Sequence, residues 1–281
     1  SGITRKEAER LGVGVLPMPF YIGEECYYED VSISRAEFLA KLAQGAEVST
    51  SQPSPASVMA FWDDALKEYE QIVYIPISSG LSGSCAAAAA LAREDAYEGR
   101  VFVVDNGRVS APQHRAVLDA LELVEEGYSA VEIRDILEAA RDQMVIYVGV
   151  ETLKYLKRGG RISPATAALG TVLHIKPVLK FDVGTLDTFQ KCRGFGKAKK
   201  TMLEAMRHDL ETQWKAYYDR GEVSLLAASS ASPEATKEWV QEIRREFPGM
   251  GILCDELSLG VSCHIGPGGL GIACSCRPKR T

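Results

Sequence analysis

The sequence lacks any long run of apolar residues. No stretch approaches the roughly 18 to 20 consecutive apolar side chains that a membrane-spanning helix requires, and residues 1–7 lack the apolar core of a signal peptide. Even so, 46% of the 281 residues are hydrophobic and 25% are charged, a balance typical of folded globular proteins. We therefore expect a folded chain with no transmembrane segment.

Positive charge is also scarce. The chain has 32 Lys and Arg against 38 Asp and Glu, a formal net charge of −6. Because nucleic-acid-binding domains present a basic face, this balance argues against a nucleic-acid partner. One basic cluster opposes the trend: Lys191, Arg193, Lys197, Lys199 and Lys200. Cations near the start of a helix oppose its dipole, so this cluster carries a small local cost that a function could explain.

The cysteines follow no disulfide or zinc-finger spacing. There are seven, an odd number scattered through the chain, which is typical of a reduced protein and predicts a cytoplasmic location. Five possible metal ligands lie near the C-terminus: Cys254, Cys263, His264, Cys274 and Cys276. None of their spacings matches a known finger, and buried free cysteine is a common core residue. We expect no metal site.

Helical and strand patterns alternate along the whole chain, which predicts an α/β protein with mainly parallel sheets. Apolar runs at 72–77, 101–104 and 145–148 predict buried parallel strands. We expect two domains. Residues 1–143 would form an N-terminal domain with a mainly parallel sheet flanked by helices, and residues 144–281 a smaller, mixed α/β C-terminal domain.

Local signals place several helix and strand ends. Thr4 with Glu7, Ser34 with Glu37, and Ser129 with Glu132 each fit a capping box, so helices should begin there. In the C-terminal part, the pattern predicts strands at 176–181 and 185–192, followed by a long amphipathic helix from about 197 to 220.

Two hydroxyl-rich loops precede predicted helices. The first, 49–55, holds four hydroxyls around a Pro-x-Pro, and Ser54 with Pro55 forms a good helix start, so it could be only a capped loop. The second, 78–84, is a Gly- and Ser-rich turn from strand to helix, where free backbone N–H groups and the helix dipole favour a small anion. It lacks the Walker, dinucleotide and Gly-x-Ser-x-Gly spacings.

A third loop, 264–271, places His264 among four glycines and a proline, which lets a ligand or another segment approach closely. A lone histidine is more often structural. The chain contains four histidines: His114, His174, His208 and His264. None stands in a motif with an acid–base partner. A hydrolase using Ser82 and His264 stays open as an alternative, although no third, orienting acid can be named.

Four segments, taken together, resemble the DegV family of bacterial fatty-acid-binding proteins, which includes the carrier subunit of fatty acid kinase. They are Val48-Ser49-Thr50-Ser51-Gln52-Pro53-Ser54-Pro55, Ile75-Pro76-Ile77-Ser78-Ser79-Gly80-Leu81-Ser82-Gly83, Leu156-Lys157-Arg158-Gly159-Gly160-Arg161-Ile162-Ser163 and His264-Ile265-Gly266-Pro267-Gly268. Their order and spacing agree with the family, and the similarity extends over essentially the whole chain.

The resemblance implies a carrier rather than an enzyme, with no cofactor and with a long-chain fatty acid such as palmitate, stearate or oleate as its ligand. Thr50 and Ser82 would contact the carboxylate, with His264 nearby and Ser79 and Gly83 as weaker candidates. Two arginines resemble positions near the head group or the docking face of a kinase that phosphorylates the bound acid to an acyl phosphate: Arg161 and Arg193.

Two departures from the family pattern bear on these expectations. The family's first strand and its Asp-Ser loop would precede Ser1. The segment Gly194-Phe195-Gly196 differs from the more basic run that the family would have after Arg193, which weakens the case for a kinase partner more than the case for a lipid site.

Overall fold

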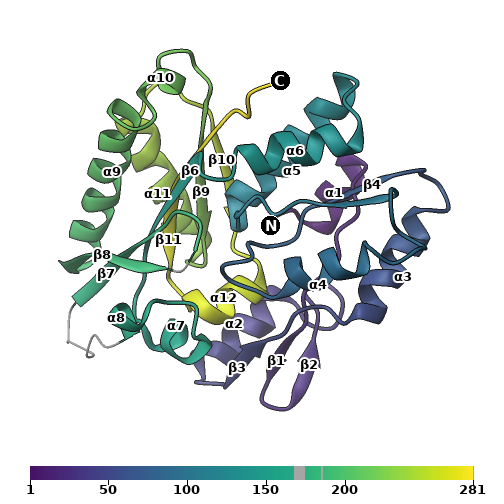
Figure 1. The fold of residues 1–281 in the computed structure, drawn as a ribbon. Coiled ribbons are helices and arrows are strands. Elements are labelled where there is room, and N and C mark those ends of the chain that lie inside the picture. The colour runs from purple at the N-terminus through teal and green to yellow at the C-terminus, as the bar shows by residue number, and fades with distance from the viewer. Residues whose placement is uncertain (168–174, 185, 281) are drawn as a thin grey trace.

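The computed structural model describes residues 1–167, 175–184 and 186–280, so His174 lies outside the described residues. The fold is mixed α/β, and its largest sheet has six strands in the order β10-β9-β11-β6-β7-β8 (Figure 1). These strands are β6 (Met144–Gly149), β7 (Ile175–Phe181), β8 (Asp187–Arg193), β9 (Val223–Ser229), β10 (Ile252–Glu256) and β11 (Leu270–Cys276). All of them follow residue 143.

Only one neighbouring pair in this sheet, β9 with β10, is parallel. The apolar run at 145–148 does form a strand, but β6 pairs antiparallel with both β11 and β7. The prediction of a parallel strand there was wrong. A continuous apolar run indicates only that both faces of a strand are buried. Here apolar clusters cover both faces of β6, although its pairing is antiparallel.

Residues before 143 form two smaller sheets among the described residues. β4 (Ile72–Tyr74) pairs in parallel with β5 (Val101–Val103), as predicted for these runs. The order of the other sheet is β2-β1-β3, and it is antiparallel throughout. Its strands are β1 (Phe20–Ile22), β2 (Glu25–Tyr27) and β3 (Val48–Thr50). A mainly parallel N-terminal sheet was therefore wrong, because the tight turn between β1 and β2 permits only antiparallel pairing.

Helices flank the sheets on several sides (Figure 1). They are α1 (Arg5–Leu11), α2 (Arg35–Ala43), α3 (Pro55–Ala65), α4 (Ser84–Leu91), α5 (Ser110–Glu125), α6 (Ala130–Ala139), α7 (Lys154–Gly159), α8 (Pro164–Ala167), α9 (Phe195–Glu211), α10 (Lys215–Tyr218), α11 (Pro233–Glu246) and α12 (Leu259–Ile265). None of the helices in the described part of the chain is long and apolar enough to cross a membrane.

The caps read from the sequence are present. Ser34 and Ser129 form complete capping boxes at α2 and α6, and Thr4 accepts a hydrogen bond from the backbone N–H of Glu7 at α1. The long helix expected to Arg220 instead ends at Glu211, and a separate short α10 follows. Thr212 leaves the helical conformation, with a φ of −121° and a ψ of −84°, and Trp214 beyond it is buried in the core.

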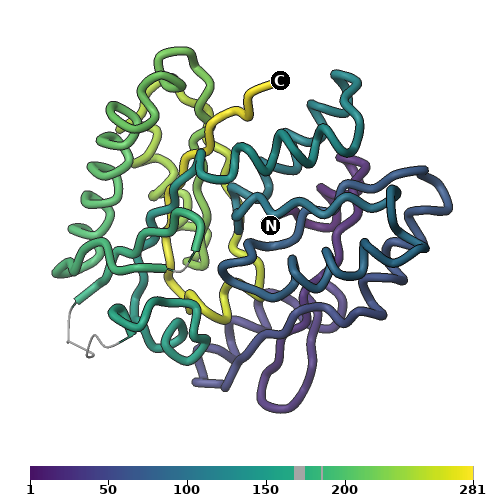
Figure 2. Tube along the Cα trace, in the orientation of Figure 1, coloured from purple at the N-terminus to yellow at the C-terminus, as the bar shows by residue number. Residues whose placement is uncertain are grey.

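Apolar clusters cross residue 143. Phe20 and Phe38 pack with Leu259 of α12, which lies against the three-stranded sheet (Figure 2). Val109 packs with Val148 in a second cluster. The two parts of the chain therefore share buried contacts, and their division into domains at residue 143 stays a prediction.

Candidate functional site

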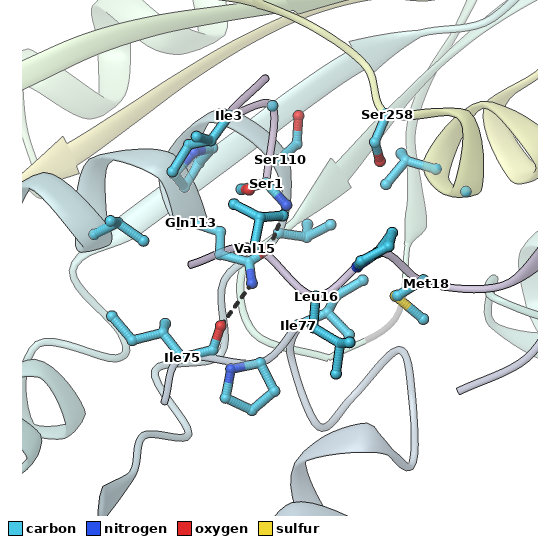
Figure 3. A pocket seen from close by; sticks show the side chains of 18 of the residues that line it. Ser1, Ile3, Val15, Leu16, Met18, Ile75, Ile77, Ser110, Gln113 and Ser258 are labelled. Carbon is cyan, nitrogen blue, oxygen red and sulfur yellow. Dashed lines mark hydrogen bonds between the residues drawn. The ribbon is translucent and has the colours of Figure 1, made fainter. Parts of the chain in front are cut away.

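A cavity of about 1270 Å³ lies between the six-stranded sheet and the residues before 143. Its walls are mostly apolar, and Figure 3 shows Val15, Leu16 and Ile77 gathered around part of it. All six residues of 72–77 line the cavity. Side chains of a strand alternate between its two faces, so one face alone could not present every residue of β4. We infer that an edge of β4 borders the cavity. Pockets for small ligands typically measure about 300–1,000 Å³, so this cavity has room for a long apolar molecule.

Polar side chains from four separate elements line the same cavity. Thr50 ends β3, Ser82 precedes α4, Arg161 follows α7, and His264 lies in α12. The structure thus brings four of the residues chosen from the sequence to one space, although they come from distant parts of the chain. Because hydroxyl, guanidinium and imidazole groups all offer hydrogen bonds, this part of the wall can hold a polar or anionic group.

Thr50 and His264 contact each other directly. The Thr50 Oγ1 and His264 Nε2 atoms are 2.8 Å apart, within hydrogen-bond distance. Burial lowers the pKa of His264 from its ordinary value of 6.5 to about 4, and the positive charge of Arg161 acts in the same direction. The imidazole is therefore neutral at pH 7, and it can orient the Thr50 hydroxyl without forming an ion pair with an acid.

Gly159 allows the imidazole to take this place. A Cβ atom built on Gly159 would lie 2.0 Å from His264 Nδ1, closer than any real contact, so a side chain there would displace the ring. Nδ1 is buried and has no hydrogen-bond partner among the described residues. Close packing thus requires glycine as the last residue of α7, which sequence reasoning did not identify.

Ser82 lies where the chain enters α4. Its Oγ accepts a hydrogen bond from the backbone N–H of Ser84 at 3.2 Å and lies 2.8 Å from the Ser84 Oγ. Arg161 Nε donates to the carbonyl oxygen of Leu81 at 3.2 Å, which ties the guanidinium to the same loop. Ser82 thus caps the first backbone N–H of α4, that of Ser84, and the N-cap residue Gly83 has no side chain that could bond the next ones.

Three of the sequence candidates do not line the cavity. Ser79 is exposed, and its Oγ accepts a hydrogen bond from Arg141 at 3.0 Å. Arg193 is exposed at the end of β8, opposite Ile175. Gly83 begins α4 beside the lining residues. Gln52 and Ser84 also line the cavity, although the sequence analysis gave them no role. Their only sequence signal was their place in the two hydroxyl-rich loops.

The geometry of a hydrolase is not present among the described residues. His264 Nε2 contacts Thr50 rather than Ser82, and Ser82 pairs with Ser84. No carboxylate contacts the other ring nitrogen of His264 in the described part of the chain.

The C-terminal cysteines do not form a metal site in the described ranges. No group of three or more His, Cys, Asp or Glu side chains there is placed to hold a metal ion. All seven cysteines are free thiols. Cys274 and Cys276 are buried in the core, and burial raises the pKa of the Cys276 thiol to about 12, so this side chain behaves as a small apolar residue.

The fold and the site define the class: a mixed α/β protein whose apolar interior cavity meets a group of polar side chains. The chain belongs to the DegV family, since the family model described as "Uncharacterised protein, DegV family" matches residues 1–277. A DegV domain-containing protein of Deinococcus radiodurans is 31% identical over 274 residues, covering 97% of this chain and 94% of the relative.

Two solved relatives have closely similar structures. A DegV family protein from Thermus thermophilus, described by its fatty-acid binding, is 32% identical with a TM-score of 0.85, covering 98% of this chain and 96% of that chain. DegV from Bacillus subtilis, described as a fatty acid binding protein, is 26% identical with a TM-score of 0.82 at the same coverage.

Proposed function

We propose that this protein binds one long-chain fatty acid, such as palmitate, stearate or oleate, with its tail in the apolar cavity and its carboxylate held by Thr50 and Ser82. The observation that carries this proposal is the continuity of the site. One cavity is lined both by apolar residues and by Thr50, Ser82, Arg161 and His264. A fatty acid needs these two unlike environments next to each other.

The tail supplies most of the affinity. Each buried methylene contributes about 0.8 kcal/mol, so fourteen methylenes contribute on the order of 11 kcal/mol before the costs of ordering. A buried carboxylate without hydrogen bonds is strongly disfavoured, so the polar residues decide where the head group lies. Tail burial then sets affinity, and the hydroxyl loops set orientation.

Arg161 and His264 play different parts in this site. Arg161 is held near Ser82 through Leu81, and a guanidinium there stabilises an anion through its charge. His264 is neutral and contacts Thr50, so it acts by holding the hydroxyl in place. The carboxylate would therefore be bound mainly by hydroxyl groups, within the field of one cation.

The bound acid would be presented to a kinase subunit that converts it to an acyl phosphate, while this chain performs no chemistry itself. Arg193, exposed outside the cavity, fits a docking role better than a head-group role. The cytoplasm is the expected compartment, because seven free thiols suit a reducing environment.

Mass spectrometry of the purified, denatured protein tests the proposal, and we expect an acyl chain to co-purify. Titration with palmitate should then show weaker binding by Thr50→Val, which keeps the side-chain shape and removes the hydroxyl, and by Ser82→Ala. We expect about a tenfold loss for each, since hydrogen bonds to charged groups contribute about 1.5–3 kcal/mol.

Ser57→Ala is the matched control, because it removes an exposed hydroxyl of α3 that does not line the cavity. Absence of co-purified lipid together with no binding of added palmitate or oleate would refute the proposed function.

A further inference from the structure

Gln52 lies in the first hydroxyl loop, two residues after Thr50, and lines the cavity. Its carboxamide has no hydrogen-bond partner among the residues that the structure describes. A primary amide offers two N–H donors and one carbonyl acceptor. Gln52 is exposed, so water can solvate this amide, and the amide can turn to a ligand without breaking a hydrogen bond within the protein.

Gly83 leaves the space that this carboxamide occupies. A Cβ atom added to Gly83 would lie 2.6 Å from Gln52 Oε1 and 3.8 Å from its Cδ, so the two loops meet at this contact. The backbone of Gly83 does not itself need glycine, because its φ of −69° and ψ of −3° suit any residue. A side chain at position 83 would therefore push the flexible end of Gln52 out of the place that it takes in the structure.

The electrostatics of α4 favour one orientation of the amide. The start of a helix carries partial positive charge, and at α4 Ser82 Oγ accepts from the Ser84 N–H while the N-cap residue Gly83 has no side chain. The carbonyl oxygen of Gln52 is the atom that lies against Gly83, so the favourable end of its dipole meets the helix. The amide N–H groups are then left free for a ligand.

We propose that Gln52 is a further head-group residue, whose amide donates a hydrogen bond to the bound carboxylate. We also propose that the missing side chain of Gly83 leaves room for the Gln52 carboxamide in this orientation. This inference rests on the proposed fatty-acid site. In this proposal Gly83 does not contact the ligand through its backbone amide. Its lack of a side chain leaves room for Gln52 instead.

The test compares palmitate with hexadecanol, which has the same chain length but no carboxylate. In Gln52→Glu the amide donors are replaced by a like charge, so we expect palmitate binding to weaken about tenfold or more and hexadecanol binding to stay within about twofold. Gln52→Ala should weaken palmitate binding less, and again selectively. A purely structural role for Gln52 would change the binding of both ligands together, and that result would overturn the proposal.

A double-mutant cycle tests the contact between Gly83 and Gln52. Gly83→Ala alone should lower palmitate affinity about as much as Gln52→Ala, and in the Gln52→Ala background it should have no further effect. Additive losses would contradict the proposed contact.

Gln71→Ala is the matched control for these variants. This glutamine also lines the cavity but precedes β4, and its amide donates to the carbonyl oxygen of Gly99. It should leave the palmitate preference unchanged. If the wild-type protein binds neither ligand, the proposed function fails as well; if it binds palmitate and the Gln52 variants keep full discrimination, only this inference fails.

Discussion

The two faces of the six-stranded sheet are built from the same strands, but one face packs against helices and the other borders the cavity. On the face covered by α9 and α11, large side chains such as Trp239, Met202 and Met206 fill the interior. On the other face, β11 presents Gly271 and Ala273 to the cavity. Side chains of a strand alternate between faces, so one run of sequence can build a solid core and a cavity wall together. The strands carry large side chains such as Phe181 and Leu226 on the cavity face too, so the covering helices α9 and α11 distinguish the two faces.

The filled face should be far more sensitive to truncation than the cavity face. Trp239 is fully buried, and its Nε1 donates to the carbonyl oxygen of Gly271 at 3.0 Å. Trp239→Ala should lower the free energy of unfolding by about 3–5 kcal/mol, measured by urea denaturation. Phe181→Ala, on the cavity side of β7, is the comparison, since Phe181 lines the cavity, and an equal loss there would show that the two faces are equally packed.

The cavity face should tolerate added volume but lose ligand. Ala273 lines the cavity from β11, and Ala273→Leu projects three more carbon atoms into it. If these displace two or three methylenes of the tail, palmitate affinity should fall by about tenfold or more, at ~0.8 kcal/mol per methylene. Shorter fatty acids should be affected less. A chain-length series from C10 to C18, with a stability measurement on the same variant, checks this, and uniform weakening at every length would speak against tail exclusion.

The sequence predicted the local features of this fold better than its long-range features. The capping boxes at Ser34 and Ser129 and the parallel pair β4–β5 were found, and the antiparallel partners of β6 were not. A cap depends on residues three positions apart, which the sequence shows directly. Strand direction depends on partners far along the chain.

In the candidate site, too, the local features could be predicted from the sequence and the long-range contacts could not. The loops holding Thr50, Ser82 and His264 were recognised separately, and the structure brings all three to one cavity. The contact of Gly159 with His264 could not be predicted, because each glycine in that segment has an ordinary local explanation in the helix end. Only the fold shows which glycine leaves room for a ring.

This contact gives a prediction about the polar part of the cavity wall. Gly159→Ala places a Cβ against the imidazole, so His264 must move away from Thr50. We expect palmitate affinity to fall several-fold, since one hydrogen bond that orients the hydroxyl is lost, at roughly 0.5–1.5 kcal/mol. Gly160→Ala is not a suitable control, because Gly160 has a φ of +68° that favours glycine. Gly196→Ala is suitable, since open space surrounds that position. Equal effects at positions 159 and 196 would contradict the packing argument.

The last prediction concerns pH. Because the pKa of His264 is about 4 in the folded protein and 6.5 ordinarily, the unfolded chain binds a proton that the folded chain excludes between these values. Folded-state stability should therefore decrease as the pH falls from about 6.5 to about 4, and change no further through this group below that. His264→Gln, which can still hydrogen-bond Thr50 but does not titrate, should flatten this part of the profile of unfolding free energy against pH. His208→Gln, at the end of α9 and outside the cavity, is the control. If the His264→Gln profile keeps the wild-type slope, the imidazole is not buried in its neutral form, and the orientation of Thr50 by a neutral ring would have to be abandoned.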